Sequence, residues 1–140
     1  MARFITHTKL KSVGRQTINQ AGGTHQYLAD EPLSQHGTDA GPSPVQYLLG
    51  SLGSCLGASI RSVADKDPNV EIKLFNVDTL GEMEIYPDKS SKIVNISVKI
   101  TCHTNLEPEQ QTNLINRAIH ICTVHNTLKA AIPIEIEILD

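Results

Sequence analysis

Two cysteines, Cys55 and Cys122, are the residues of this chain whose type and surroundings could do chemistry. Each lies within an apolar helical pattern, and each has polar residues close by in the sequence. Two thiols brought together by the fold could form one redox centre, because an oxidised thiol can condense with a second thiol to give a disulfide. His125 follows Cys122 by one helical turn and therefore shares its helical face. A neighbouring imidazolium can lower the pKa of a thiol, and the thiolate is the reactive form.

Packing is a simpler interpretation of the same residues. Free cysteine is among the most frequently buried residue types, so Cys55 could equally be a small side chain of the core. Cys102 alternates with polar residues on the inward side of an expected strand, where packing explains it fully. The sequence leaves chemistry and burial both open for Cys55 and Cys122, and it favours burial for Cys102.

Metal binding is a weaker hypothesis, although several Cys and His residues fall in the second half of the chain. His120 and His125 diverge around a helix, and Cys102 and His103 point to opposite faces of a strand. The sequence contains no Cys-x-x-Cys or His-x-x-x-His pattern. A serine or cysteine hydrolase finds no support either, because the Gly-x-Ser-x-Gly elbow is missing and no acid is placed to orient a histidine. We therefore expect neither a metal nor a cofactor.

The elements that must position Cys55 begin with a small antiparallel sheet. Strand patterns cover residues 4–10, 15–18 and 24–28, and Gly22-Gly23 is placed to turn between the last two. Proline and glycine then mark a loop over residues 30–44.

A long helix is predicted to follow this loop. Ser43 directly before Pro44 matches an N-cap residue followed by proline at the first helical position, and the apolar pattern continues to about Asp65. Cys55 lies beside the apolar stripe of this helix, which contains Leu48, Leu52, Leu56 and Val63.

The second half of the chain predicts two strands, a helix and a closing strand. The strands cover residues 70–85 and 94–102, with a turn between them. A second helix opens at Glu107-Pro108-Glu109, and its stripe of Leu114, Ala118, Ile121, Cys122, His125 and Leu128 carries it through the second cysteine. The last strand covers residues 134–138.

This order of elements predicts an α+β domain in which two main helices cover one face of a mostly antiparallel sheet. At 140 residues and 39% hydrophobic, the chain fits a single domain over residues 1–140 with one core. The first helix is so apolar that one chain of this length would leave part of it uncovered, which suggests a dimer.

Charge and hydropathy exclude several classes of partner. The net charge of -3 and the lack of a basic cluster argue against nucleic acid. The N-terminus has no apolar core of the kind a secretion signal needs, and no apolar run approaches the ~20 residues that span a bilayer. We expect a soluble, cytoplasmic protein without a membrane partner, in which a reducing environment favours thiol chemistry over a structural disulfide framework.

The chain resembles the OsmC/Ohr family in three places. These are Asp-Glu-Pro at residues 30–32, the lead-in Gly-Pro-Ser-Pro at residues 41–44 followed by Leu-Gly-Ser-Cys ending at Cys55, and the segment that runs from Cys122 through His125 to Leu128. The resemblance covers essentially the whole chain. It implies the OsmC-like fold and an intertwined homodimer whose central helices pack together and whose active sites draw on both subunits.

The same resemblance implies a thiol-dependent peroxidase that acts in oxidative stress defence and, in the Ohr branch, prefers organic hydroperoxides. Cys55 matches the peroxidatic cysteine and Cys122 the resolving cysteine. A dithiol must then reset the pair, and in the Ohr branch that reductant is a lipoyl-bearing protein.

Gly14-Arg15 matches the family's arginine, which stabilises the thiolate and orients the peroxide. In the Ohr branch a glutamate after the helix-starting proline holds this arginine, and much of the wider family has an acid one residue later. Val45 and Gln46 occupy these positions here. Gln46 can hydrogen-bond a guanidinium but cannot form a salt bridge, so we expect Gln46 and His125 as supporting residues.

A second departure is Thr123, where many relatives have proline after the late cysteine. Threonine predicts that the helix continues through this point.

Two alternatives to the peroxidase stay open at this stage. One is a weakly catalytic or non-catalytic protein of the same family that binds a small hydrophobic ligand in the dimer cleft. Val45 would favour such a ligand, because it is apolar where the family has an acid. The other is a structural dimer with buried, unreactive thiols.

Overall fold

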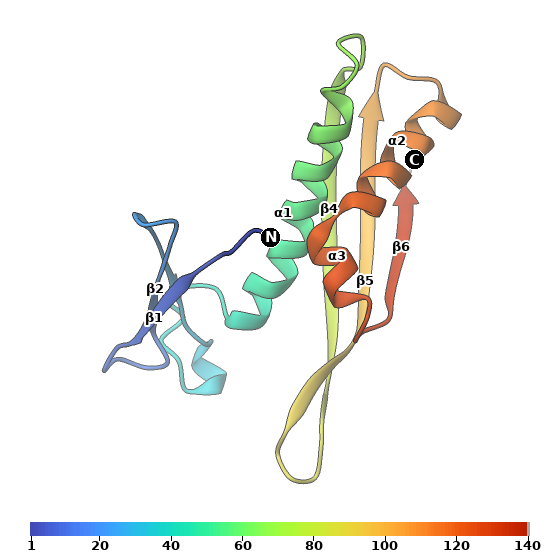
Figure 1. The fold of residues 1–140 in the computed structure, drawn as a ribbon. Helices are drawn as coiled ribbons and strands as arrows, with labels where there is room; N and C mark the ends of the chain where they lie inside the picture. Colours follow the sequence, from blue (N-terminus) through green and yellow to red (C-terminus); the bar gives the residue numbers. More distant parts are fainter. Residues whose placement is uncertain (140) are drawn as a thin grey trace. The chain divides into compact units, whose positions relative to one another are not determined.

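The computed structural model describes residues 1–139 and divides the chain into two compact units. The first unit is Met1–Leu48 and the second begins at Leu49. The elements in chain order (Figure 1) are β1 (Thr6–Leu10), β2 (Thr17–Ala21), β3 (His25–Ala29), the 3₁₀ helix η1 (Leu33–Gln35), α1 (Pro44–Ala64), β4 (Ile72–Ile85), β5 (Ser91–Thr104), α2 (Pro108–Ile121), α3 (Thr123–Leu128) and β6 (Ile134–Leu139). The predicted α+β class is confirmed, whereas the prediction of a single domain over residues 1–140 stays a prediction.

The first unit contains a three-stranded antiparallel sheet in the order β1-β2-β3. Gly22 and Gly23 both have positive φ and form the turn between β2 and β3, as their position predicted. The strands begin later than the sequence pattern indicated, since β1 starts at Thr6 and β2 at Thr17.

Arg15 lies in a turn before β2, so the prediction of a strand over residues 15–18 is wrong at its start. Gly14 is the reason for this turn. Its φ is +53°, and a Cβ at this position would lie 2.7 Å from Cγ2 of Thr38. Only glycine satisfies both the backbone angle and the close approach, and the turn it makes sets where Arg15 leaves the backbone.

The carboxylate of Asp30 ties the loops of the first unit together. This side chain is only 1% exposed. Its oxygens accept the backbone N–H groups of Arg15 at 3.1 Å, Glu31 at 2.8 Å, Thr38 at 3.0 Å and Ala40 at 3.1 Å, and the Thr38 hydroxyl at 2.5 Å. The Thr38 hydroxyl has the largest effect on the pKa of Asp30, and with the backbone N–H groups it holds that pKa well below its ordinary value despite burial.

The second unit contains a sheet in the order β4-β5-β6. β4 and β5 form a long antiparallel hairpin, while β5 and β6 run parallel. Parallel neighbours need a crossover connection, and α2 and α3 provide it. The chain therefore forms two separate three-stranded sheets, one of them partly parallel, where the sequence predicted one mostly antiparallel sheet.

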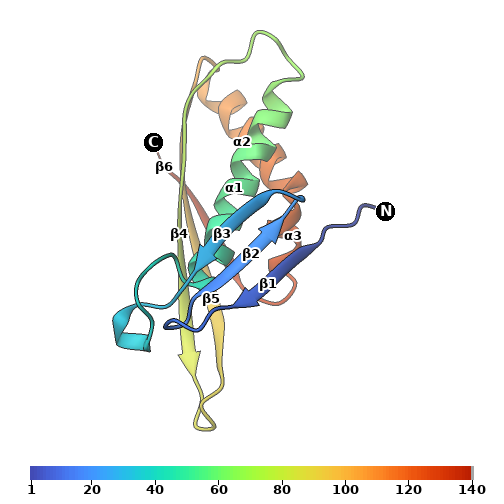
Figure 2. The same ribbon diagram turned by 90° about the vertical axis from the view of Figure 1, so that its left-hand side faces the viewer.

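The helices lie on one face of this second sheet, as Figure 2 shows for α1, α2 and α3. The core between them is built from alternate residues of β5, which confirms the predicted half-buried strand, and from one stripe of each long helix. Its buried members include Ile96, Val98, Ile100 and Cys102 from β5, Leu52, Leu56 and Ile60 from α1, and Leu114, Ile115 and Ala118 from α2.

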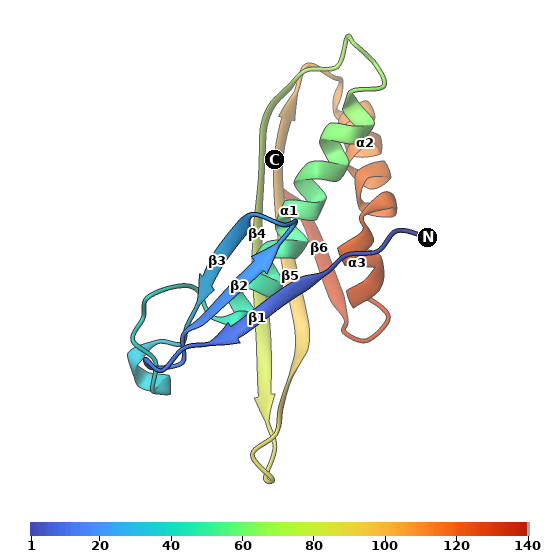
Figure 3. The same ribbon diagram turned by 60° about the vertical axis from the view of Figure 1, so that its left-hand side comes forward.

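The second predicted helix is broken at Cys122, so the prediction that Thr123 lets it continue is wrong. Figure 3 shows α2 and α3 as two successive helices. Cys122 has φ -68° and ψ 110°, an extended conformation that ends α2 and caps the start of α3. Ile121, expected on the apolar stripe, is the last residue of α2 and is 46% exposed.

Within residues 1–139, no helix has both the length and the apolar character needed to cross a bilayer.

Replacing Asp30 by Asn should lower the urea midpoint of unfolding at neutral pH, because one acceptor oxygen becomes an amide donor facing N–H groups. The folded pKa of Asp30 is depressed, so its stabilisation is complete above the unfolded pKa of about 3.9 and is lost as the pH falls through the folded pKa. The difference between wild type and Asp30→Asn should therefore shrink as the pH falls below about 4.

Urea unfolding followed by circular dichroism at several pH values measures this difference. Asp39→Asn is the matched control, since Asp39 is an exposed acid in the same loop and should leave the midpoint unchanged. Equal midpoints for wild type and Asp30→Asn at neutral pH would contradict the structural role given to Asp30.

Candidate functional site

The start of α1 determines where Cys55 lies. Ser43 Oγ accepts the N–H of Gln46 at 3.3 Å, and Gln46 Oε1 accepts the N–H of Ser43 at 2.8 Å. This reciprocal pair is a capping box, which satisfies two backbone donors at the beginning of the helix. The predicted helix start at Pro44 is thus confirmed, and Cys55 follows three turns later, half-buried beside the core.

Gln46 is used by this cap. The sequence led us to expect a hydrogen bond between Gln46 and the guanidinium of Arg15. In the structure, the side-chain oxygen of Gln46 accepts the backbone N–H of Ser43. Its local role is therefore to begin α1.

Cys122 is fully buried at the junction of α2 and α3. Its sulfur accepts the backbone N–H of His125 at 3.5 Å, which caps the first turn of α3. The extended backbone at Cys122 also frees the next N–H groups from the hydrogen-bond ladder of α2.

Cys55 and Cys122 are close enough for each thiol to shift the pKa of the other, and both thiols are free. Burial alone would raise the pKa of Cys55, but four hydrogen bonds outweigh it. In order of decreasing effect, they come from the N–H of Val124, the thiol of Cys122, the N–H of Thr123 and the hydroxyl of Ser59, and they bring the pKa of Cys55 below its ordinary value.

The pKa of Cys122 is shifted in the opposite direction. Burial raises its pKa most, and the neighbouring Cys55 sulfur raises it further, while the N–H of His125 and the hydroxyl of Ser59 oppose the change. Of the two thiols, Cys55 therefore ionises more readily, whereas Cys122 keeps its proton to higher pH. Such a pair divides into one nucleophilic sulfur and one protonated partner.

His125 contacts this pair through its backbone. Burial, assisted by the charge of Lys129, lowers the pKa of the imidazole although Asn126 opposes the shift, so the ring is neutral at neutral pH. Its Nδ1 is buried and has no hydrogen-bond partner among the described residues. The sequence predicted an imidazolium near the thiols, whereas in the structure the backbone N–H of His125 reaches Cys122.

The predicted site residues thus fall in two places. Cys55, Cys122 and His125 come together in the second unit, whereas Arg15 and Gln46 belong to the first. Arg15 is exposed, and its backbone N–H is held by Asp30 at 3.1 Å.

Ser59 and the N–H groups of Thr123 and Val124 were not identified from the sequence. Ser59 could have been found, because it lies four residues after Cys55 and so on the same face of α1. The two N–H groups could not, since they become available only through the break at Cys122.

Cys102 is buried in β5, and burial raises its pKa. In the part of the chain that the structure describes, His, Cys, Asp and Glu side chains form no cluster of three that could hold a metal ion.

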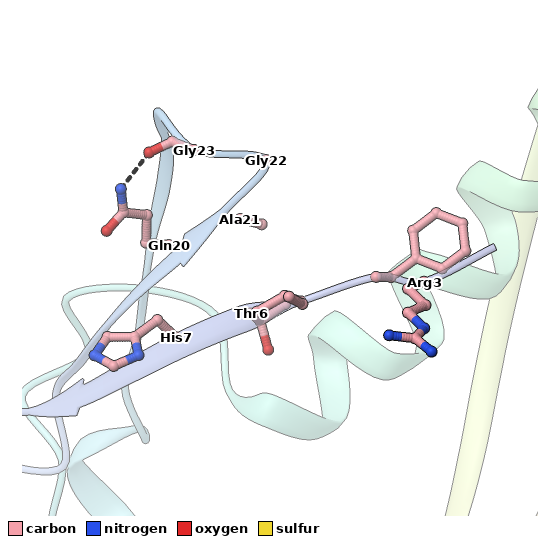
Figure 4. A pocket seen from close by; sticks show the side chains of 9 residues that line it. Arg3, Thr6, His7, Gln20, Ala21, Gly22 and Gly23 are labelled. Carbon is pink, nitrogen blue, oxygen red and sulfur yellow. Dashed lines mark hydrogen bonds between the residues drawn. The ribbon is translucent and has the colours of Figure 1, made fainter.

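A pocket of about 580 Å³ lies elsewhere, in the first unit. Figure 4 shows its walls, which are the segment Arg3 to His7 and the end of β2 with its glycine turn, where the Gln20 side chain donates to the Gly23 carbonyl. No cysteine lines this pocket.

Solved structures with the same fold come from several bacteria. An OsmC-like protein from Mycoplasma pneumoniae matches with a TM-score of 0.85 and 18% identity, over 99% of this chain and 96% of that one. An organic hydroperoxide resistance protein OsmC from Legionella pneumophila matches with a TM-score of 0.73 and 15% identity, over 100% and 98%. An organic hydroperoxide resistance protein from Elizabethkingia anophelis, which has thiocyanate bound, matches with a TM-score of 0.76 and 12% identity, over 100% and 97%. These similarities define the class of fold.

The family model for OsmC-like proteins matches residues 37–137, so the chain belongs to the OsmC-like protein family. The matched region contains both Cys55 and Cys122. No curated protein matches the chain.

Alkylation should distinguish the three cysteines. Cys55 is half-buried with a lowered pKa, whereas Cys102 and Cys122 are buried with raised pKa values. Iodoacetamide should therefore modify Cys55 first, with a half-maximal rate at a pH below the value of about 8.5 for a free cysteine. Peptide mapping of the native protein over a range of pH measures each rate, and equal rates at Cys55 and Cys102 would contradict the site.

Proposed function

We propose that this protein is a thiol-dependent peroxidase that reduces hydroperoxides, with organic hydroperoxides preferred, through Cys55 and Cys122. The observation that carries the proposal is the contact between two free thiols whose pKa values are shifted in opposite directions. Family membership and the hydroperoxide resistance proteins of the same fold support it.

In the first step, the Cys55 thiolate attacks the outer oxygen of the hydroperoxide. The O–O bond breaks, Cys55 becomes a sulfenic acid, and the leaving alkoxide takes a proton to become the alcohol. The N–H groups of Thr123 and Val124 suit this step because they lower the pKa of Cys55 and so favour its thiolate, without supplying a competing nucleophile.

In the second step, the sulfur of Cys122 attacks the sulfenic acid. The S–S bond forms, the S–O bond breaks, and the hydroxyl leaves as water with the thiol proton. A small external dithiol, such as a lipoyl group on a protein, then reduces the disulfide by thiol exchange. A reducing compartment such as the cytoplasm suits this cycle.

From its match to the arginine of the family, we propose that Arg15 stabilises the thiolate and donates to the peroxide. Its guanidinium stays charged at all relevant pH values and offers several donors. The Gly14 turn and the Asp30 carboxylate together fix the backbone of Arg15 within the first unit.

We further propose that the protein works as a homodimer. Phe4, Ile5 and Leu10 in the first unit and Leu80 and Met83 in β4 are more than half exposed in the single chain. A partner chain that covered these side chains would remove their apolar surface from water. Light scattering should give the mass of two chains, and the mass of one chain would contradict the dimer.

The cysteine variants separate the two steps. Cys55→Ser should reduce cumene hydroperoxide turnover to background, because the nucleophile is gone. Cys122→Ser should still consume one equivalent of peroxide and accumulate a sulfenic acid, but it should not turn over with dihydrolipoate.

Cys102→Ser is the matched control and should keep wild-type turnover, since Cys102 serves only the core. Full turnover by Cys55→Ser would refute the proposed function. Slow or absent reaction of the wild type would instead favour a ligand-binding role.

Arg15→Ala should lower the rate of Cys55 oxidation by roughly 100-fold, the usual cost of removing one donor that stabilises developing charge. Arg15→Lys should recover only part of the rate, because an ammonium lacks the planar fork. Stopped-flow kinetics with one equivalent of peroxide measures these rates. The control is Arg61→Ala, an exposed arginine of α1, and an Arg15→Ala rate equal to the control would exclude Arg15 from the site.

A further inference from the structure

A second pocket, of about 430 Å³, lies within the second unit. One wall is the last turn of α1 with the turns that follow it, and the other is α2 with the loop that precedes it. A volume of this size is typical of sites that hold a small organic molecule. Of the described residues, those that line it include neither Cys55 nor Cys122, so the proposed peroxidase leaves this pocket unused.

The floor of the pocket is apolar. Val63 and Leu114 belong to the core of the second unit and are 4% and 5% exposed. Val70 and Leu106 are half-buried and pack against the same core. The apolar part of a ligand that settled on this floor would leave water, which favours binding.

The rim of the pocket is polar, and it carries two cations against one acid. Gln110, Asn113 and Arg117 lie on one face of α2, three and four residues apart. Lys66 comes from the turn after α1. These four side chains have no hydrogen-bond or ion-pair partner among residues 1–139, so their donors are available to a ligand.

The acid of the rim is Asp67, and its carboxylate belongs to the turn after α1. One of its oxygens accepts the N–H of Asn69 at 2.9 Å. Asn105, in the loop before α2, holds the same turn, because its side chain donates to the Asn69 carbonyl at 2.7 Å and accepts the N–H of Glu71 at 2.9 Å. These bonds join the two walls, so the turn that carries Lys66 is fixed before a ligand arrives, which lowers the entropy lost on binding.

We propose that this pocket binds a small organic carboxylate, with the carboxylate group at Arg117 and Lys66 and an apolar body on the floor. The guanidinium of Arg117 offers a planar fork of donors that matches a carboxylate, and the ammonium of Lys66 adds a second positive charge. A neutral ligand would leave both charges unused, and a small anion without an apolar body would leave the floor in water. The site is independent of the proposed peroxidase function, since it uses no cysteine.

Octanoate is a suitable probe, because it joins one carboxylate to a short apolar chain. Isothermal titration calorimetry with the full chain should show one site per chain, and the affinity should fall as salt is added because ions screen the attraction between charges. 1-Octanol has the chain without the charge, and acetate has the charge without the chain, so each should bind at least tenfold more weakly than octanoate. Failure of the wild type to bind octanoate, or equal affinity for any two of these probes, would overturn the proposal.

Arg117→Gln and Lys66→Gln each remove one charge from the rim. Each should weaken octanoate binding by roughly tenfold, because a hydrogen bond between charged groups is lost. Arg61→Gln and Lys73→Gln are the matched controls, since both residues are exposed cations of the second unit outside the pocket lining, and Arg61 is two positions before Val63 and so faces another way on α1. The controls should bind octanoate as the wild type does.

Nuclear magnetic resonance locates the bound probe. Octanoate should shift the amide resonances of Asn113, Leu114 and Arg117 and leave that of Cys55 in place. Shifts centred on Cys55, or one affinity shared by the two rim variants and the two controls, would overturn the proposal. Both results are read without hydroperoxide, so a failure of the peroxidase function is distinguished from a failure of this site.

Discussion

The break between α2 and α3 at Cys122 is the constraint on which the candidate site depends. In a continuous helix, the N–H groups of Thr123 and Val124 would bond to carbonyl groups one turn earlier. The extended backbone of Cys122 releases them, and they lower the pKa of Cys55 instead. The same break turns the Cys122 sulfur into the cap of α3. One local change of backbone therefore supplies the donors for a thiolate and places a second thiol beside it.

The first unit meets a different requirement, which is to hold polar loops in a fixed arrangement without a large core. A single carboxylate holds these loops, because Asp30 accepts donors from two other segments of the chain, the turn at Arg15 and residues 38–40. Gly14 makes the adjoining turn possible, and the cap of Ser43 and Gln46 starts α1. In this protein Gln46 stabilises a helix end at a position where the resemblance led us to expect support for an arginine.

Local patterns in the sequence predicted a good part of this fold. The start of α1 at Pro44 follows from its cap, and the burial of β5 follows from strict alternation, since both are properties of neighbouring residues. The break at Cys122 could not be predicted, because neither Cys122 nor Thr123 is a helix breaker and the break is stabilised by contacts with α1. The role of Asp30 was missed because most of its partners lie 8 to 15 residues away in the sequence and meet it only through the turns of the loop. The nearness of Ser59 to Cys55 could be predicted, because the two residues are four positions apart on α1.

The most direct test of the account is peptide mapping after the reduced protein has reacted with one equivalent of cumene hydroperoxide. The account predicts rapid loss of two hydrogen atoms and a disulfide that joins Cys55 to Cys122, with Cys102 left as a free thiol. Unchanged mass, or oxidation spread over all three cysteines, would contradict the claim that the two sulfurs form one redox centre.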